Sequence, residues 1–143
     1  SPRDVEEAVD ETIRRARTLT DLLACAEGPL EFSDLVSLGA GDGNPGVLDR
    51  DLVNLRRFLV GGGRSSSVVF GHPALGDYFR EQVPEPLEFH LRFSQWGLSI
   101  IDELAKGTRK PSQVPNYLTS HLCTHLQGAG HGTHALGMLL REG

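Results

Sequence analysis

Cysteine, methionine and long apolar runs are all scarce in this sequence. Only two of its 143 residues are cysteines, Cys25 and Cys123, and they stand far apart with no CxxC pair. A disulfide-stapled scaffold needs more cysteines than this, so we expect a reduced, cytoplasmic protein. No apolar run approaches the roughly 18–20 residues that span a bilayer, and the N-terminus reads as a charged helix. We therefore expect a protein without membrane contacts.

An excess of positive charge is also missing. The formal net charge is −5, and the apolar content of 38% is ordinary for a globular chain. Nucleic-acid binding is driven by phosphate contacts that need a basic excess, so this balance argues against a dominant nucleic-acid surface. The only methionine is Met138, and the first residue is Ser1. We therefore expect the chain to be a piece of a longer protein.

The first half of the chain mixes helical periodicity with short strand-like runs. Apolar residues recur at three- and four-residue steps in the helical parts, and glycine or proline ends each run. Asn44 followed by Pro45 is a typical helix start. The predicted elements are a helix over 4–26, a minor strand over 30–32, a short helix over 34–38 capped by Ser33, a helix over 45–59 capped by Asn44, a β-hairpin over 59–72, and a helix from Pro73.

Beyond the Pro84-Glu85-Pro86 sequence the strand signals stop. The patterns predict a long helix containing Phe89 to Leu104, a second over 115–128 and a third over 133–141. Three helices followed by a two-stranded ribbon are typical of a winged helix, a variant of the helix-turn-helix. The predicted fold class is therefore mainly α, with a winged-helix domain over 1–84 and a helical, bundle- or repeat-like domain over 85–143.

The stretch HLCTHLQGAGHGTH holds many metal-ligand types: His121, Cys123, His125, His131 and His134. The first two histidines of the stretch are four residues apart on one helical face, which can chelate a metal. However, the glutamate of an HExxH motif is missing, and Cys123 points to the opposite side of the helix. The favoured interpretation is structural, with Tyr117, His121 and His125 packed against the preceding helix. No metal site is predicted.

Phosphate loops and catalytic nucleophiles also lack support. GGGRSSS has no Gly-Lys-Ser/Thr ending and leads into a strand, and GAGDGNPG fits no better. The serines at 65, 66 and 67 lie in a turn without a GxSxG elbow, and Cys25 falls within an apolar helical stripe. No enzymatic reaction class is predicted for this chain.

A winged helix raises the question of DNA binding. The recognition helix would be 45–59, and its outward face would carry Arg50, Asp51, Asn54 and Arg57, with Arg64 on the wing. Asp49 and Asp51 dilute those positive groups. A protein-contact module is therefore favoured, and a winged-helix transcriptional regulator with a helical dimerisation tail is the alternative.

Four passages resemble the winged-helix domain, and the helical region after it, of the STAND signalling ATPases, which include the NACHT and NB-ARC proteins. They are LTDLLACAEGPLEFSDLVSL, VLDRDLVNLRRFLV, VVFGHPALGDYFRE, and Trp96 followed by PNYLTSHLCTHLQGAG. Each motif is short, but their order and spacing cover nearly the whole chain. The resemblance implies a non-catalytic regulatory piece of a bacterial, NACHT-like signalling NTPase, for example in antiviral defence.

The resemblance also assigns a role to His72. In that family the histidine at this corner reaches the β-phosphate of ADP and holds the winged helix over the NTPase core, which keeps the protein inactive. It implies ATP or ADP with Mg²⁺ in the parent protein and no cofactor in this piece. The implied partners are the protein's own NTPase core, C-terminal sensor repeats and, on activation, other proteins. Pro73 stands where many members have aspartate, so a second contact from that position is not expected. The competing interpretation is that His72 only caps the turn and packs.

Overall fold

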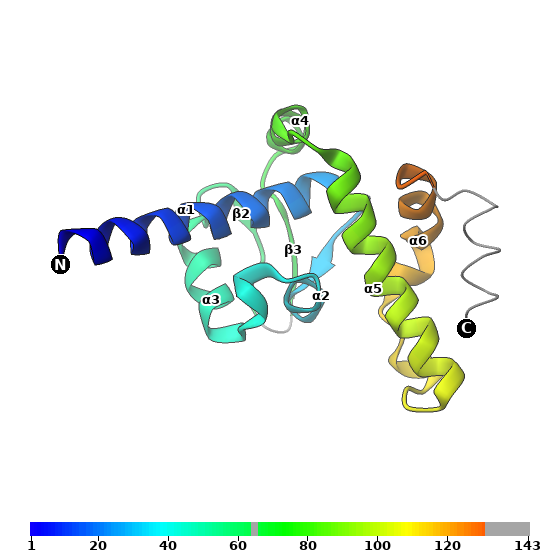
Figure 1. Ribbon diagram of the computed structural model, residues 1–143. Helices are drawn as coiled ribbons and strands as arrows, with labels where there is room; N and C mark the ends of the chain where they lie inside the picture. The colour runs from blue at the N-terminus through cyan, green and yellow to red at the C-terminus, as the bar shows by residue number, and fades with distance from the viewer. Residues whose placement is uncertain (64–65, 131–143) are drawn as a thin grey trace. The chain divides into compact units, whose positions relative to one another are not determined.

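The computed structural model describes residues 1–63 and 66–130, which divide into two compact units on either side of the Val83–Pro84 bond. The expected mainly-α class is confirmed for this part of the chain, which is mostly helical with one small sheet (Figure 1). None of its helices is both long and apolar enough to cross a membrane.

The first unit alternates helices and short strands. In chain order it contains α1 (Pro2–Cys25), β1 (Leu30–Glu31), α2 (Phe32–Ser37), the 3₁₀ helix η1 (Ala40–Gly43), α3 (Pro45–Asn54), β2 (Leu59–Val60), β3 (Ser67–Phe70) and α4 (Pro73–Gln82).

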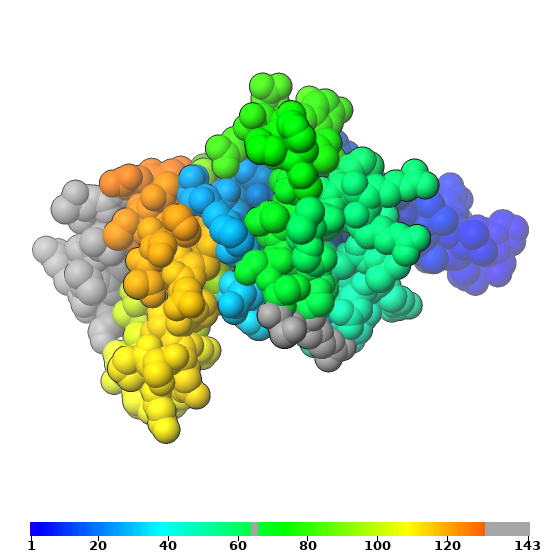
Figure 2. Space-filling view, turned by 180° about the vertical axis from the view of Figure 1, so that it is seen from behind, coloured from blue at the N-terminus to red at the C-terminus, as the bar shows by residue number. Residues whose placement is uncertain are grey.

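The three strands form one antiparallel sheet in the order β1-β3-β2. Leu30 lies opposite Val68, and Leu59 lies opposite Phe70. On the face seen in Figure 2, the light blue of β1 lies beside the green of β3. Gly61 makes the tight exit from β2 possible, because it has φ +86° and a Cβ there would lie 1.8 Å from the carbonyl oxygen of Ser67.

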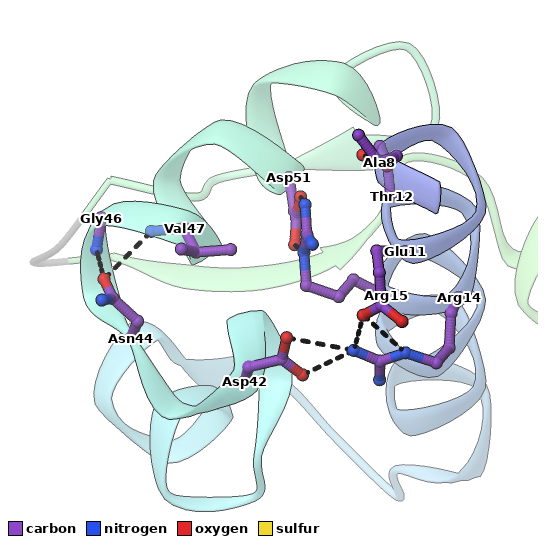
Figure 3. Close-up of polar contacts among 10 residues, drawn as sticks. All are labelled: Ala8, Glu11, Thr12, Arg14, Arg15, Asp42, Asn44, Gly46, Val47 and Asp51. Atoms are coloured by element: carbon purple, nitrogen blue, oxygen red, sulfur yellow. Dashed lines mark hydrogen bonds and ion pairs between the residues drawn. The ribbon is translucent and has the colours of Figure 1, made fainter. Parts of the chain in front are cut away.

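The core of this unit gathers side chains from every layer around the sheet. Its fully buried apolar residues come from the last turns of α1, from β1, α2, α3 and β3; they are Leu19, Leu22, Leu30, Leu35, Leu48 and Val68. The predicted cap at the start of α3 is confirmed, since the Asn44 side chain accepts the backbone N–H groups of Gly46 and Val47 (Figure 3).

Two predicted helix boundaries are wrong. The helix expected over 45–59 ends at Asn54, because the chain must turn through residues 55–58 before Leu59 can pair with β3. Ser33 is not a cap either. The helix α2 already begins at Phe32, where the Asp34 side chain accepts the backbone N–H of Glu31.

Charged side chains tie α1 to the elements beside it. Arg15 of α1 reaches Asp51 of α3, with Nε–Oδ2 at 3.0 Å, and the Asp51 side chain is only 2% exposed. Nη2 of Arg14 lies 2.9 and 3.0 Å from the two carboxylate oxygens of Asp42 in η1, and Arg14 also contacts Glu11, but these groups are about half exposed (Figure 3). The first pair is therefore part of the core, and the second is a surface contact.

The second unit is helical throughout its described part. It contains α5 (Pro86–Lys106), the 3₁₀ helix η2 (Pro111–Gln113) and α6 (Asn116–Gly128). α5 begins with Pro86 at its first position and ends on Gly107 in the left-handed conformation. α6 lies against α5, where Gly97 lets the backbone approach so closely that a Cβ would lie 2.3 Å from a methyl of Leu122. The helix expected over 133–141 lies outside the described residues.

Candidate functional site

The corner between β3 and α4 places His72 at the N-terminus of a helix. β3 ends at Phe70, Gly71 follows, and His72 is the N-cap of α4 with extended backbone angles of φ −147° and ψ 137°. Pro73 then occupies the first helical position, where its missing N–H costs nothing and its fixed φ favours the helix. The sequence Gly-His-Pro thus converts a strand into a helix within three residues.

One ring nitrogen of His72 is used by the protein itself. Nδ1 accepts the backbone N–H of Ala74 at 3.0 Å, in the way that an aspartate or asparagine caps a helix. A neutral imidazole that accepts at Nδ1 carries its proton on Nε2. The side chain is exposed, so Nε2–H is a donor available at the surface of the first unit.

His72 also lines a hollow of about 550 Å³ that lies wholly within the first unit. The end of α1, the loop after it, β3 and the first turns of α4 form its walls, which are mainly apolar. Arg80 of α4 stands on one side, where Nε and Nη2 donate to the carbonyl oxygens of Ala24 and Ala26 at 2.9 and 3.3 Å. Because α1 has no basic residue in its own last turn, Arg80 supplies the cation that favours that helix end.

The aromatic-histidine pattern of the second unit packs as the structural interpretation expects. Tyr117 and His125 of α6 are buried, and their rings lie 5.4 and 4.0 Å from the ring of Phe93 in α5. His121 lies on Tyr117, with ring centroids 4.9 Å apart, and Cys123 is exposed. Within residues 1–63 and 66–130, no three His, Cys, Asp or Glu side chains come together as a metal-binding group. His131 and His134 lie outside the described residues.

His90 is the member of this group that sequence reasoning missed. Its Nδ1 lies 3.0 Å from Nδ1 of His125, and the two rings belong to different helices. The signal for it was present, because His90 precedes Phe93 by three residues and therefore shares its face of α5. A histidine one turn from a predicted core aromatic is a candidate partner for a histidine in the facing helix.

The remaining candidates divide into buried and exposed residues. Cys25 is 5% exposed, and burial raises the pKa of its thiol to about 11, so little thiolate forms at neutral pH. The glycine-rich stretch before α3 has a packing reason, since a Cβ on Gly41 would lie 2.6 Å from the backbone nitrogen of Leu48. Ser66 closes the turn locally by accepting the N–H of Gly63, while Arg64 and Ser65 lie outside the described residues.

The expected DNA-reading face needs one correction. Asp51 does not point outward beside Arg50, because it is buried and paired with Arg15 of α1. The exposed arginines of this segment are Arg50, within α3, and Arg56 and Arg57, in the turn after it. The dilution of positive charge that Asp51 was expected to provide is therefore absent from this surface.

Comparisons with protein families, with curated proteins and with solved structures found no match to this chain.

Proposed function

We propose that the first unit is a winged-helix module with a regulatory rather than catalytic role in a STAND-type signalling NTPase. In this proposal the module docks on the protein's own nucleotide-binding core through the His72 corner and holds the core inactive. The helices that follow Pro84 connect it to a sensor region. The proposal implies a cytoplasmic protein whose partners are its own core and the proteins it meets on activation.

The order of the elements supports the winged-helix part of this proposal. A helix, a short strand, two further helices and a β-ribbon follow one another as α1, β1, α2, α3, β2 and β3, and the sheet order is β1-β3-β2. That arrangement is the one expected when the ribbon of a winged helix pairs with the strand after its first helix. Proteins of many functions share this order and pairing of elements, so the site and not the fold distinguishes among them.

The observation that carries the docking role is the state of the His72 ring. Its Nδ1 is held by the backbone of Ala74, which fixes the tautomer and the direction of the ring. The opposite nitrogen then presents an N–H at an exposed corner, beside the partly positive end of a ten-residue helix. A phosphate oxygen of a nucleotide is a suitable acceptor for such a donor.

The experiment uses the protein in which this chain is joined to its NTPase core. His72→Ala removes both the cap and the Nε2 donor. His72→Asn keeps an oxygen that can cap the N–H of Ala74, but its shorter amide N–H ends near the position of Cδ2 and does not replace the donor at Nε2. We expect both variants to retain less ADP through gel filtration than the parent and to signal more strongly without a trigger. Glu7→Ala, at an exposed position of α1, serves as the surface control.

The asparagine variant separates docking from capping. If His72 only caps α4, His72→Asn should behave like the parent protein. His72→Ala should then unfold at a lower temperature without a change in ADP retention. Parent-like retention and basal signalling in both variants would refute the docking role.

A second candidate function, nucleic-acid binding, is favoured by one specific observation. Arg50, within α3, and Arg56 and Arg57, in the turn after it, are exposed, and their side chains have no hydrogen bond or ion pair within the described residues. If they contact phosphates, duplex DNA should bind at low salt and weaken steeply as salt rises, and replacing all three by alanine should abolish the binding. No binding at 20–50 mM salt, roughly the range where phosphate contacts are strongest, would remove this candidate.

A further inference from the structure

The second unit buries a chain of three hydrogen-bonding rings between its two long helices. His125 of α6 is 0% exposed and stacks on Phe93, with planes 4° apart. Its Nε2 lies 2.5 Å from the hydroxyl of Tyr117, and its Nδ1 lies 3.0 Å from Nδ1 of His90. Both nitrogens of the buried ring are therefore engaged, one on its own helix and one across the helix pair.

The contact between the two Nδ1 atoms holds one proton. If His125 donates it, Nε2 of His125 is unprotonated and accepts a hydrogen bond from the Tyr117 hydroxyl. If His90 donates it, Nε2 of His125 carries the proton and donates to the Tyr117 oxygen. Both arrangements leave His125 neutral and satisfy every nitrogen of the buried ring.

One extra proton is compatible with this network, but two are not. His90 is half-buried and can carry a proton on each nitrogen while it donates to His125. A further proton on His125 would put two N–H groups against each other and place two positive charges in neighbouring rings. Neutral pH therefore favours the closed network, and the state in which His90 and His125 are both positively charged disfavours it.

Among the residues that the structure describes, no group near His125 would offset a charge on its ring. The titratable groups facing it are His90 from α5, and Tyr117 and His121 from α6. Burial first, and then His90 and His121, lower the pKa of His125 to about 4. The nearest charged residues along α5, Glu88 and Arg92, pair with each other at 3.4 Å.

We propose that the His90–His125 pair is a proton-sensitive latch that holds α6 on α5 at neutral pH and releases it in mild acid. The release requires no partner, and the inference does not rest on the function proposed for His72. In the released state both imidazoles are in water and ionise near pH 6.5.

The sign of the effect follows from the protons bound in each state. Between about pH 6.5 and 4 the released state binds a proton at His125 that the closed state excludes, so acid favours release. The ratio of closed to released molecules should fall by up to about tenfold for each pH unit in that window. Below about pH 4 both states bind the proton, and the ratio should stop changing from this cause.

Trp96 is a built-in reporter for the experiment, because it is the only tryptophan in the sequence. It is 7% exposed, and its ring lies 6.2 Å from that of Tyr117 across the two helices. We expect its emission to move to longer wavelength as the pH of the whole chain falls from 7.5 to 4.5. In parallel, side-chain ¹⁵N NMR should show His125 as a neutral, single tautomer at pH 7.5.

Two variants identify the pair as the cause. His125→Phe keeps a ring against Phe93 but cannot ionise, so the emission change between pH 6.5 and 4.5 should disappear. His90→Gln can still meet Nδ1 of His125 and removes the second charge, so the change should shrink and move to lower pH. His72→Asn, which alters an imidazole in the other unit, should leave the transition as it is.

Several results would overturn the latch. They are unchanged Trp96 emission in the parent chain over this range, an unchanged transition in His90→Gln, or NMR spectra in which His125 is charged at pH 6 while α6 stays packed. If His125→Phe is already open at pH 7.5, His90→Gln and the NMR titration decide the question by themselves.

Discussion

The two units stabilise their buried polar side chains by different chemistry. In residues 1–83 one buried polar group, Asp51, forms an ion pair with Arg15 from another helix. In the unit that begins at Pro84 one buried polar group is His125, whose pKa is lowered mainly by burial and whose two ring nitrogens contact Tyr117 and His90. Carboxylates and guanidinium groups in water keep their charges from pH 5 to 8, whereas imidazoles that reach water ionise within that range. Because of this difference, we expect mild acid to destabilise the second unit and not the first.

The largest effect should come from breaking the charge pair of the first unit. Arg15→Ala leaves the Asp51 carboxylate buried without its partner, and we expect a loss of about 3 kcal/mol in the free energy of unfolding. Urea denaturation followed by circular dichroism measures it. Arg14→Ala is the matched control one residue earlier. Its partners are half exposed, so it should change little.

The double replacement Arg15→Met with Asp51→Leu sharpens the same test. It removes both charges and keeps apolar volume, so it should recover most of the stability that Arg15→Ala loses. A double variant as unstable as Arg15→Ala would mean that packing, and not an unpaired charge, accounts for the loss.

A smaller effect concerns the sign of the change in stability as the pH falls, which should differ between the two units. Burial raises the pKa of Asp34, which is 4% exposed and accepts the N–H of Glu31. A carboxyl whose pKa is raised by folding stabilises most below its unfolded pKa, near 3.9, and this contribution is lost as the pH rises through the folded pKa. As the pH falls, the first unit therefore gains from Asp34 while the second loses at His125.

Asp34→Asn keeps an acceptor oxygen and cannot ionise. We expect it to match or exceed the parent at pH 7 by up to about 1 kcal/mol, and to show less gain in stability between pH 6 and 4. Asp34→Ala removes the acceptor and should lose about 1 kcal/mol. Urea titrations at both pH values measure these differences, and a clear loss at pH 7 in the asparagine variant would count against a burial-raised pKa.

The smallest effect tests a neutral group of the second unit. Ser94 of α5 is 2% exposed, and its hydroxyl has no hydrogen-bond partner among the described residues. Ser94→Ala therefore removes a buried oxygen without removing a bond, and should leave stability unchanged or raise it by up to about 1 kcal/mol. Ser99→Ala is the control on the same helix. It breaks the bond at 2.7 Å from Ser99 Oγ to the carbonyl of Trp96 and should not be stabilising. Trp96 fluorescence in urea reports both.

Local signals predicted most of the elements of this fold. The caps, prolines and apolar periods place α1, α4, α5 and α6 close to their observed ranges, and the strand-like runs on either side of the glycines predict the β2–β3 ribbon. The end of α3 was wrong, because the run from Leu48 to Leu59 keeps helical spacing through a turn that only pairing with β3 imposes. Tertiary context outweighs local propensity there.

The contacts of the polar side chains were harder to predict than the elements. His72 could be placed at a helix start because its neighbours in sequence define the corner, and its cap on Ala74 is local. Asp51 and His90 were misjudged or missed because their partners are 36 and 35 residues away. A helical wheel gives the direction of a side chain, but it does not say which charge or ring the facing helix presents.

The proline pair at the boundary has a mechanical consequence. α4 stops at Gln82, and Pro84 and Pro86 lack the N–H groups that a continuous helix through this point would need. α4 and α5 therefore cannot fuse into one rod, in either state of the latch. Residues 83–85 therefore interrupt the helix at this boundary, and the covalent chemistry of the two prolines imposes the interruption.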